Sequence, residues 1–167
     1  MTEEESKDMI LDVETDLKER AKPRPGDIAV SDDMLNEAEN VIANMANEYI
    51  TWVKDDIARL DAVFEKFVEK QDMASLHDLF EISHDMKGQG GSFGYNLITT
   101  VTGSLCKFVE ALQKKESRPY DEKEVSAIKV HIDAIKLIAS EHIKGDGGDI
   151  GRQLIDGIDA VKKKLNM

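Results

Sequence analysis

Residues 76–94 read LHDLFEISHDMKGQGGSFG and combine the apolar stripe of a helix with a cluster of glycines. Leu76, Leu79, Ser83 and Met86 recur every three or four positions, which predicts an amphipathic helix that begins near Asp72. A glycine inside a helix costs roughly 1 kcal/mol relative to alanine, so the glycines at positions 88, 90 and 91 together cost about 3 kcal/mol. We expect some role of this segment to offset that cost.

The rest of the chain repeats this amphipathic pattern. After Ser31, the expected N-cap, an apolar stripe continues for about nine turns, as one long helix or as two helices with a bend. Further helices are expected at about residues 96–115, 121–143 and 149–165, the last after the turn GDGGD. The apolar residues of these stripes are Leu35, Ala38, Val41, Ile42, Met45, Tyr49, Trp52, Val53, Ile57, Leu60, Phe64, Phe67, Leu97, Val101, Leu105, Phe108, Leu112, Val125, Ile128, Ile132, Ile135, Ile138, Ile150, Leu154, Ile158, Val161 and Leu165.

The composition also favours helices over sheet. The 167 residues include only 11 Gly and 3 Pro, aromatic residues make up 5%, and alternating β-branched runs are few. Because short connections between amphipathic helices make neighbouring helices antiparallel, we expect an all-α fold. The expected architecture is an up-and-down four-helix bundle over about residues 32–144, followed by a short C-terminal helix at 149–165. One domain of residues 31–167 would hold both.

Residues 1–30 are expected to form a separate N-terminal arm. Ile10, Val13 and Leu17 recur at helical spacing, but KPRPGD at residues 22–27 contains two prolines and a glycine that interrupt any helix. This arm could form a helix packed on the rest of the protein, or it could be a frayed or disordered tail, and the sequence leaves both alternatives open.

Charge and cysteine content exclude several classes of function. Lys and Arg total 22 against 34 Asp and Glu, and this net charge of −12 would repel a nucleic-acid backbone. A single cysteine, Cys106, rules out an internal disulfide and a multi-cysteine zinc site. The acidic start MTEEESKD does not look like a signal peptide, and no uncharged apolar run approaches the roughly 18 residues of a membrane span. We therefore expect a cytoplasmic protein that binds neither nucleic acid nor membranes.

His84 is expected at the solvent-facing rim of its helix. On a helical wheel its face lies about 110° from the centre of the core stripe. The glycines on this face leave a strip without side chains where another protein's backbone can approach, and a lysine one turn away offers a cation to a phosphate on the imidazole. The face therefore suits an incoming phosphoryl group and its donor. The other residues on it are His77, Lys87, Gly88, Gly91 and Tyr95.

The string HDMKGQGGSFG at residues 84–94 strongly resembles the phosphorylation motif of histidine-containing phosphotransfer (HPt) domains. The matching positions are His84, Lys87, Gly88 and Gly94. The resemblance implies that His84 accepts a phosphoryl group, that Lys87 helps to hold its oxygens, and that Gly88 clears room for a receiver domain. It extends over a four-helix bundle at about residues 32–144, whereas residues 1–30 and the last helix lie outside what the family requires.

The resemblance also implies a role in two-component signalling. The chain would be a phosphorelay intermediate that takes a phosphoryl group from the aspartate of a response-regulator receiver domain, or of a hybrid histidine kinase, and passes it to another receiver. Mg²⁺ would come with the partner, and the chain itself would need no cofactor. The sequence contains no ATP-binding glycine motif, so we expect a carrier protein and not a kinase. We also expect the protein to be a monomer.

The supporting residues around His84 are less clear. Some relatives carry a polar residue on the next helix that hydrogen-bonds the histidine, and by motif offset that position falls on Cys106, a poor donor. Ser104 and Lys107 are expected at about the same level and are candidates to take its place. Receiver partners of such domains dock through an apolar patch, for which the candidates beside His84 are Phe80 and Tyr95.

Three other interpretations stay open. A histidine-kinase phosphoacceptor hairpin would need a proline a few residues after His84, and that proline is absent. A helical scaffold that only binds partners is compatible with the pattern. A metal–carboxylate bundle could use His77, Glu81 and His84, but it would need a second ExxH pair, which the sequence lacks. His131 and His142 are expected to be surface or packing residues.

Overall fold

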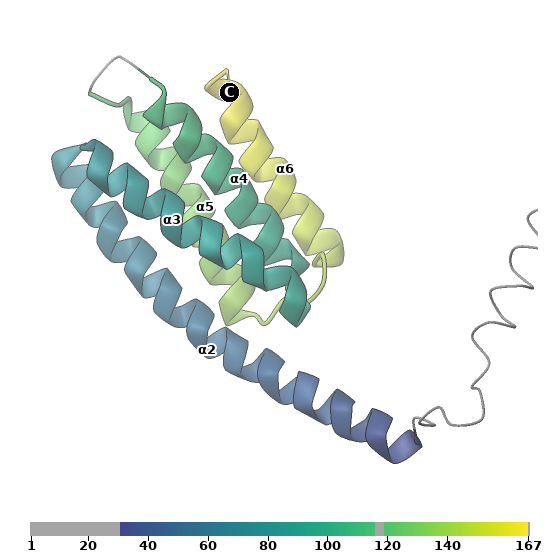
Figure 1. Ribbon diagram of the computed structural model, residues 1–167. Helices are drawn as coiled ribbons and strands as arrows, with labels where there is room; N and C mark the ends of the chain where they lie inside the picture. Colours follow the sequence, from purple (N-terminus) through teal and green to yellow (C-terminus); the bar gives the residue numbers. More distant parts are fainter. Residues whose placement is uncertain (1–30, 116–118, 167) are drawn as a thin grey trace, which may run out of the picture. The chain divides into compact units, whose positions relative to one another are not determined.

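The computed structural model describes residues 31–115 and 119–166, and within them every regular element is helical. The all-α class is confirmed, and five α-helices pack together (Figure 1). The predicted arm at residues 1–30 lies outside the described residues. The elements are α2 (Asp32–Lys70), α3 (Met73–Gly90), the short 3-10 helix η1 (Gly91–Phe93), α4 (Asn96–Gln113), α5 (Glu122–Ser140) and α6 (Gly148–Lys164).

The chain divides into two compact units, residues 1–40 and residues 41–167. The described part of the first unit, residues 31–40, consists of exposed residues and forms the start of α2. The hydroxyl oxygen of Ser31 accepts a hydrogen bond from the backbone N–H of Met34 at 3.2 Å, as expected of an N-cap. The sequence left open one long helix or two helices with a bend, and the structure confirms one continuous helix of 39 residues.

The apolar stripe of α2 is buried only in part. Burial begins at Ala46, and Val41, Ile42, Met45 and Trp52 are 43–62% exposed. Leu35 is likewise exposed. An amphipathic pattern shows which face of a helix is apolar but not how far along the helix its neighbours extend.

The core of the second unit is built from the inward faces of α2 to α6. α3 packs most extensively against α4, α4 packs against α5, and α5 packs against α6. Aromatic contacts hold α2 in this core. The Tyr49 ring stacks on the Phe93 ring with centroids 4.7 Å apart, and the ring centroids of Phe67 and Tyr120 are 5.4 Å apart. Fully buried side chains include Leu60, Leu76, Leu79, Met86, Leu97, Ile98, Leu105 and Leu112. Each such side chain contributes about 1.5–3 kcal/mol by leaving water.

Specific caps determine both ends of α3. The Asp72 carboxylate accepts a hydrogen bond from the Ser75 backbone N–H at 2.8 Å, which confirms the predicted start. At the other end, the Tyr95 N–H donates to the Gly90 carbonyl at 2.9 Å and the Gly94 N–H donates to the Gly91 carbonyl at 3.3 Å. Gly94 has a φ of 79°, the left-handed conformation that such a Schellman cap requires. The helical face of His84 therefore ends at η1 and does not continue to Tyr95.

The last two helices differ in detail from the expectation. α5 begins with a capping box between Asp121 and Glu124 but ends at Ser140, three residues before the predicted boundary, and His142 then has a φ of 51°. α6 begins at Gly148, inside GDGGD, and Ile150 is 54% exposed instead of facing the core. None of the helices within residues 31–115 and 119–166 combines the length and the apolar composition that a membrane span requires.

Candidate functional site

His84 lies in the middle of α3 and is exposed, as the helical wheel predicts. One turn earlier, the ring of Phe80 stacks against its imidazole, with centroids 5.8 Å apart and planes 23° apart. Phe80 is half-buried and packs on the hydrophobic core, so the histidine ring contacts a side chain that is itself held by packing.

The side chain of His84 is exposed to solvent. Among the described residues, it stacks on Phe80 and forms no hydrogen bond through its imidazole. A neutral imidazole keeps a lone pair on one nitrogen, and this lone pair can attack an electrophile that approaches from solution. The geometry therefore provides an unblocked nucleophile.

The glycines that follow His84 have two different roles. A Cβ atom placed on Gly88 would meet no atom within 4 Å, so internal packing does not require a glycine there. A Cβ on Gly90 would lie 2.6 Å from the Thr99 hydroxyl and 3.0 Å from the Tyr95 carbonyl oxygen, so close packing of α3 on α4 does require Gly90. Gly91 is intermediate, with one ordinary contact at 3.8 Å. Within the cluster at residues 88–91, Gly88 thus has the most open surroundings, and Gly157 of α6 likewise has no atom within 4 Å of a Cβ position.

Lys87 is exposed, and its side chain runs along α4. The aliphatic carbons of Lys87 lie 3.6 Å from the position that a Cβ on Gly103 would take, and the Thr99 hydroxyl donates to the Lys87 carbonyl at 3.2 Å. Lys87 lines a cavity between α3, α4 and α6. Its four-carbon stem is flexible, so the charge can reorient toward a phosphoryl group one turn away.

The structure does not bring Ser104 to His84, which corrects one expectation for the supporting residue. The Ser104 hydroxyl lies 3.0 Å from Nε2 of His131 and accepts a hydrogen bond from Lys162 at 3.3 Å. Lys107 is exposed and lines the same cavity as Lys87. Cys106 is buried, and burial raises the pKa of its thiol, an effect that the charge of Lys87 partly opposes.

His131 is fully buried. Of the two alternatives predicted for it, a surface residue or a packing residue, the structure shows a packing residue. Its Nδ1 lies 2.7 Å from the Ala127 carbonyl oxygen, and because a carbonyl can only accept, Nδ1 carries the proton and Nε2 accepts from Ser104. Burial is the main cause of a lowered His131 pKa, with a smaller lowering by Lys162. The signal for its burial was present in the sequence, since position 131 lies three residues after Ile128 on the inward face of the helix.

The prediction that Tyr95 contributes to a docking surface is wrong. Its side chain is 1% exposed, and its ring lies 5.5 Å from that of Tyr49. The Schellman cap at Gly94 turns the chain so that Tyr95 enters the core instead of continuing the exposed face of α3. Of the two aromatic candidates, Phe80 alone is partly accessible.

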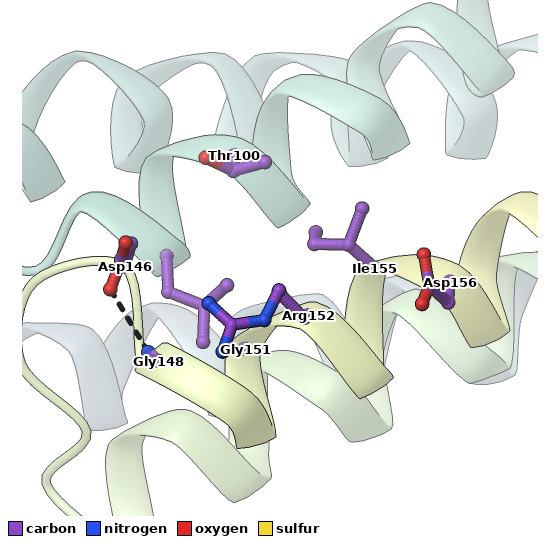
Figure 2. Close-up of a pocket in the computed structure, with 8 residues that line it drawn as sticks. Thr100, Asp146, Gly148, Gly151, Arg152, Ile155 and Asp156 are labelled. Atoms are coloured by element: carbon purple, nitrogen blue, oxygen red, sulfur yellow. Dashed lines mark hydrogen bonds between the residues drawn. The ribbon is translucent and has the colours of Figure 1, made fainter.

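A second cavity, of about 230 Å³, lies between the start of α4, the loop before α6 and α6 itself (Figure 2). Figure 2 shows the Asp146 carboxylate accepting a hydrogen bond from the Gly148 N–H, at 2.9 Å. Arg152 borders the cavity and pairs with Asp149. A Cβ on Gly151 would clash with the Asp146 carbonyl oxygen, so this glycine serves loop packing. The cavity holds none of the predicted site residues.

The exposed side of α3 thus brings together Phe80, His84 and Gly88, with Lys87 beside them, and leaves Ser104 and Tyr95 elsewhere. In the part of the chain that the structure describes, no group of three or more His, Cys, Asp or Glu side chains is placed to share a metal ion. Comparison with known proteins finds no matching family model, no matching curated protein and no matching solved structure.

Proposed function

We propose that this protein is a phosphorelay intermediate in which His84 carries the phosphoryl group. The observation that carries the proposal is the open space at Gly88, where a Cβ would meet nothing within 4 Å. A glycine in the middle of a helix costs about 1 kcal/mol, and here no internal contact accounts for it. Clearance for an approaching protein, one turn from an exposed imidazole, does account for it.

The chemistry needs little from this chain beyond a positioned nucleophile. The lone pair of one His84 ring nitrogen attacks the phosphorus of an aspartyl phosphate on a receiver domain; the N–P bond forms and the P–O bond to the aspartate breaks. The carboxylate leaves with its electron pair and stays on the receiver, and the proton on the other ring nitrogen can pass to water because the ring is exposed. A second receiver aspartate reverses these steps and removes the phosphoryl group.

Lys87 and the partner supply the positive charge that the transferred group needs. Lys87 offers one ammonium to the phosphoryl oxygens, and Mg²⁺ belongs to the receiver's own site. The chain acts as a carrier without a kinase activity or a resident cofactor. We place its partners among response-regulator receiver domains and hybrid histidine kinases, and we propose that it acts as a monomer in the cytoplasm.

The finer architecture belongs to the same proposal. Short connections join α2 to α3, α3 to α4 and α4 to α5, and consecutive helices contribute to one core. This arrangement supports an up-and-down four-helix bundle of α2 to α5, with α6 added against α5, as in an HPt domain. The HPt resemblance of residues 84–94 is the second support.

A helical scaffold without phosphotransfer is the competing proposal. It is favoured by the exposed apolar residues of α2, among them Val41, Ile42 and Met45. Such a scaffold would bind partners but would carry no phosphate on His84, so a chemical assay separates the two proposals.

The test is phosphoryl transfer from a receiver domain labelled on its aspartate. We expect the wild-type chain and a His77→Gln control, altered at another exposed histidine of α3, to acquire label that is stable to alkali and labile to acid. His84→Gln should remain unlabelled with an unchanged melting temperature, because an exposed side chain contributes little packing. Labelling of His84→Gln at the wild-type level would refute the assignment of the acceptor.

A further inference from the structure

A cavity of about 370 Å³ lies between α3, α4 and α6, away from the exposed ring of His84. Its ionisable lining consists of three lysines and one aspartate, a formal charge of +2 in a chain whose net charge is −12. Such a local concentration of positive charge is opposite to the rest of the protein and attracts anions. The residues that line it are Lys87, Thr99, Thr100, Gly103, Ser104, Lys107, Ile155, Ile158, Asp159 and Lys162.

Lys162 of α6 is held at the wall of this cavity. Its side chain is 23% exposed, and its ammonium donates to the Ser104 hydroxyl oxygen at 3.3 Å and lies 3.7 Å from the Asp159 carboxylate. An ammonium group has three N–H donors, so donors remain for a ligand. The Ser104 proton is committed to His131, which leaves Ser104 as an acceptor that positions Lys162.

Lys87 and Lys107 complete the positive lining from α3 and α4. The Lys87 stem passes along α4 beside Gly103, with its carbons at ordinary contact distance, 3.6 Å, from where a Cβ on Gly103 would stand. The threonine hydroxyls are used elsewhere: Thr99 donates to the Lys87 carbonyl and Thr100 donates to the Asn96 carbonyl. Recognition of a ligand therefore falls to the three ammonium groups.

We propose that this cavity binds a phosphate group, as inorganic phosphate or as the phosphate of a small phosphomonoester, through Lys87, Lys107 and Lys162. A dianion with several acceptor oxygens matches a cavity lined by three lysines with a local charge of +2. The cavity volume leaves room for a group larger than phosphate itself. Lys162 comes from α6, so the site depends on the helix outside the bundle of α2 to α5.

Occupation of the cavity has a consequence for the exposed histidine, and this consequence rests on the proposed function. An anion bound by Lys87 holds that ammonium toward α6 and away from a phosphoryl group on His84. Bound phosphate should then slow transfer to His84, and the cavity would act as a regulatory site.

The binding test uses the full-length, unphosphorylated protein and inorganic phosphate at constant ionic strength. Amide chemical shifts of Gly103, Ser104 and Lys107 are followed during the titration. The key comparison is Lys162→Gln with Lys163→Gln, which removes the same charge from the same helix at an exposed position outside the cavity lining. A parallel titration with glycerol 3-phosphate distinguishes the free ion from a phosphomonoester, and saturable binding of either supports the site.

We expect saturable shifts in the wild type, a loss of affinity of about tenfold or more in Lys162→Gln, and a change within about twofold in Lys163→Gln. Non-saturable shifts, or equal weakening in both variants, would overturn the proposal. If Lys162→Gln does not fold, Lys107→Gln provides the same comparison. Phosphate binding without transfer to His84 would refute the proposed phosphorelay function but support the cavity site. Transfer to His84 without saturable phosphate binding would refute the cavity site but support the phosphorelay function.

Discussion

The imidazole of His84 stacks on the ring of Phe80, with centroids 5.8 Å apart and planes 23° apart. Phe80 is half-buried against the core, so this contact restrains the ring of an otherwise exposed side chain. A restrained nucleophile loses less orientational freedom when a phosphoryl donor arrives. The contact therefore connects the packing of α3 with the proposed chemistry.

Replacement of Phe80 tests this connection. Phe80→Ala should slow transfer to His84 by roughly two- to tenfold, since a ring-to-ring contact contributes about 0.5–1.5 kcal/mol. Phe80→Tyr, which keeps the ring, should transfer at close to the wild-type rate. Transfer rates are measured from a labelled receiver at saturating concentration, so that weaker docking does not contribute. Equal rates in all three proteins would mean that the stacking does not orient the histidine.

Gly88 and Gly90 form a matched pair for separating partner clearance from internal packing. Gly88→Gln should reduce transfer while the free energy of unfolding holds or rises by up to about 1 kcal/mol, because a mid-helix glycine is removed into open space. Gly90→Ala should destabilise the protein, because its Cβ would meet the Thr99 hydroxyl at 2.6 Å. Thermal unfolding and transfer rates are measured for both. An unstable Gly88→Gln protein, or one with full transfer activity, would contradict this separation.

Lys87 should matter for the phosphoryl group more than for docking. Lys87→Ala removes the cation one turn from His84 and should shorten the lifetime of the phosphohistidine or slow its formation, by roughly tenfold for the loss of one charge-assisted hydrogen bond. Receiver affinity, measured by titration of the unphosphorylated proteins, should change by less than about twofold. A large loss of affinity with normal transfer at saturation would assign Lys87 to docking instead.

Protonation of His131 should make the fold sensitive to acid. Burial lowers its folded-state pKa below the ordinary value of 6.5, so between these two values the unfolded chain binds more protons than the folded one. The free energy of unfolding should therefore fall as the pH drops below 6.5. An NMR titration of the His131 ring checks the pKa directly, and Lys162→Gln should raise that pKa because the Lys162 charge lowers it. A His131 pKa at or above 6.5 in the wild type would contradict the prediction.

Tyr49 provides a test of the core. Its hydroxyl is buried and has no hydrogen-bond partner among the described protein atoms, and burial, with a smaller effect of Asp56, raises its pKa to about 12. Tyr49→Phe removes this unsatisfied group while keeping the stacking on Phe93. We expect the free energy of unfolding to rise by about 1 kcal/mol, since an unpaired buried polar group costs about 1–3 kcal/mol. Chemical denaturation measures the change, and a loss of stability would show that the hydroxyl is satisfied in solution.

The sequence predicted the all-α class and the approximate helices because local signals agreed with the tertiary structure. Ser31 and Asp72 each begin a helix as cap residues, and the inward residues of α4 follow the predicted stripe from Leu97 to Leu112. Local periodicity carries no information about where a neighbouring helix ends, so the exposure of Ile42 and Met45 was not predicted. The burial of Tyr95 was missed because a helical wheel assumes that the helix continues beyond the Gly94 cap.

The candidate site was predictable where it depends on a single helix. His84, Lys87 and Gly88 keep the positions on α3 that the wheel assigns to them. Residues on neighbouring helices were not predictable, because the depth and rotation of α4 against α5 decide that Ser104 meets His131 and not His84. The same limitation hid the cavity, since Lys162 reaches it only through the packing of α6.

The most direct test of the central claim is to locate the phosphoryl group after incubation with a phosphorylated receiver domain. Tandem mass spectrometry under alkaline conditions, which preserve phosphohistidine, identifies the modified residue in the intact full-length protein. We expect one phosphoryl group per chain, on His84, and its loss when a second, unphosphorylated receiver domain is added. Phosphate on another residue, or no phosphate on a protein that binds the receiver, would contradict it.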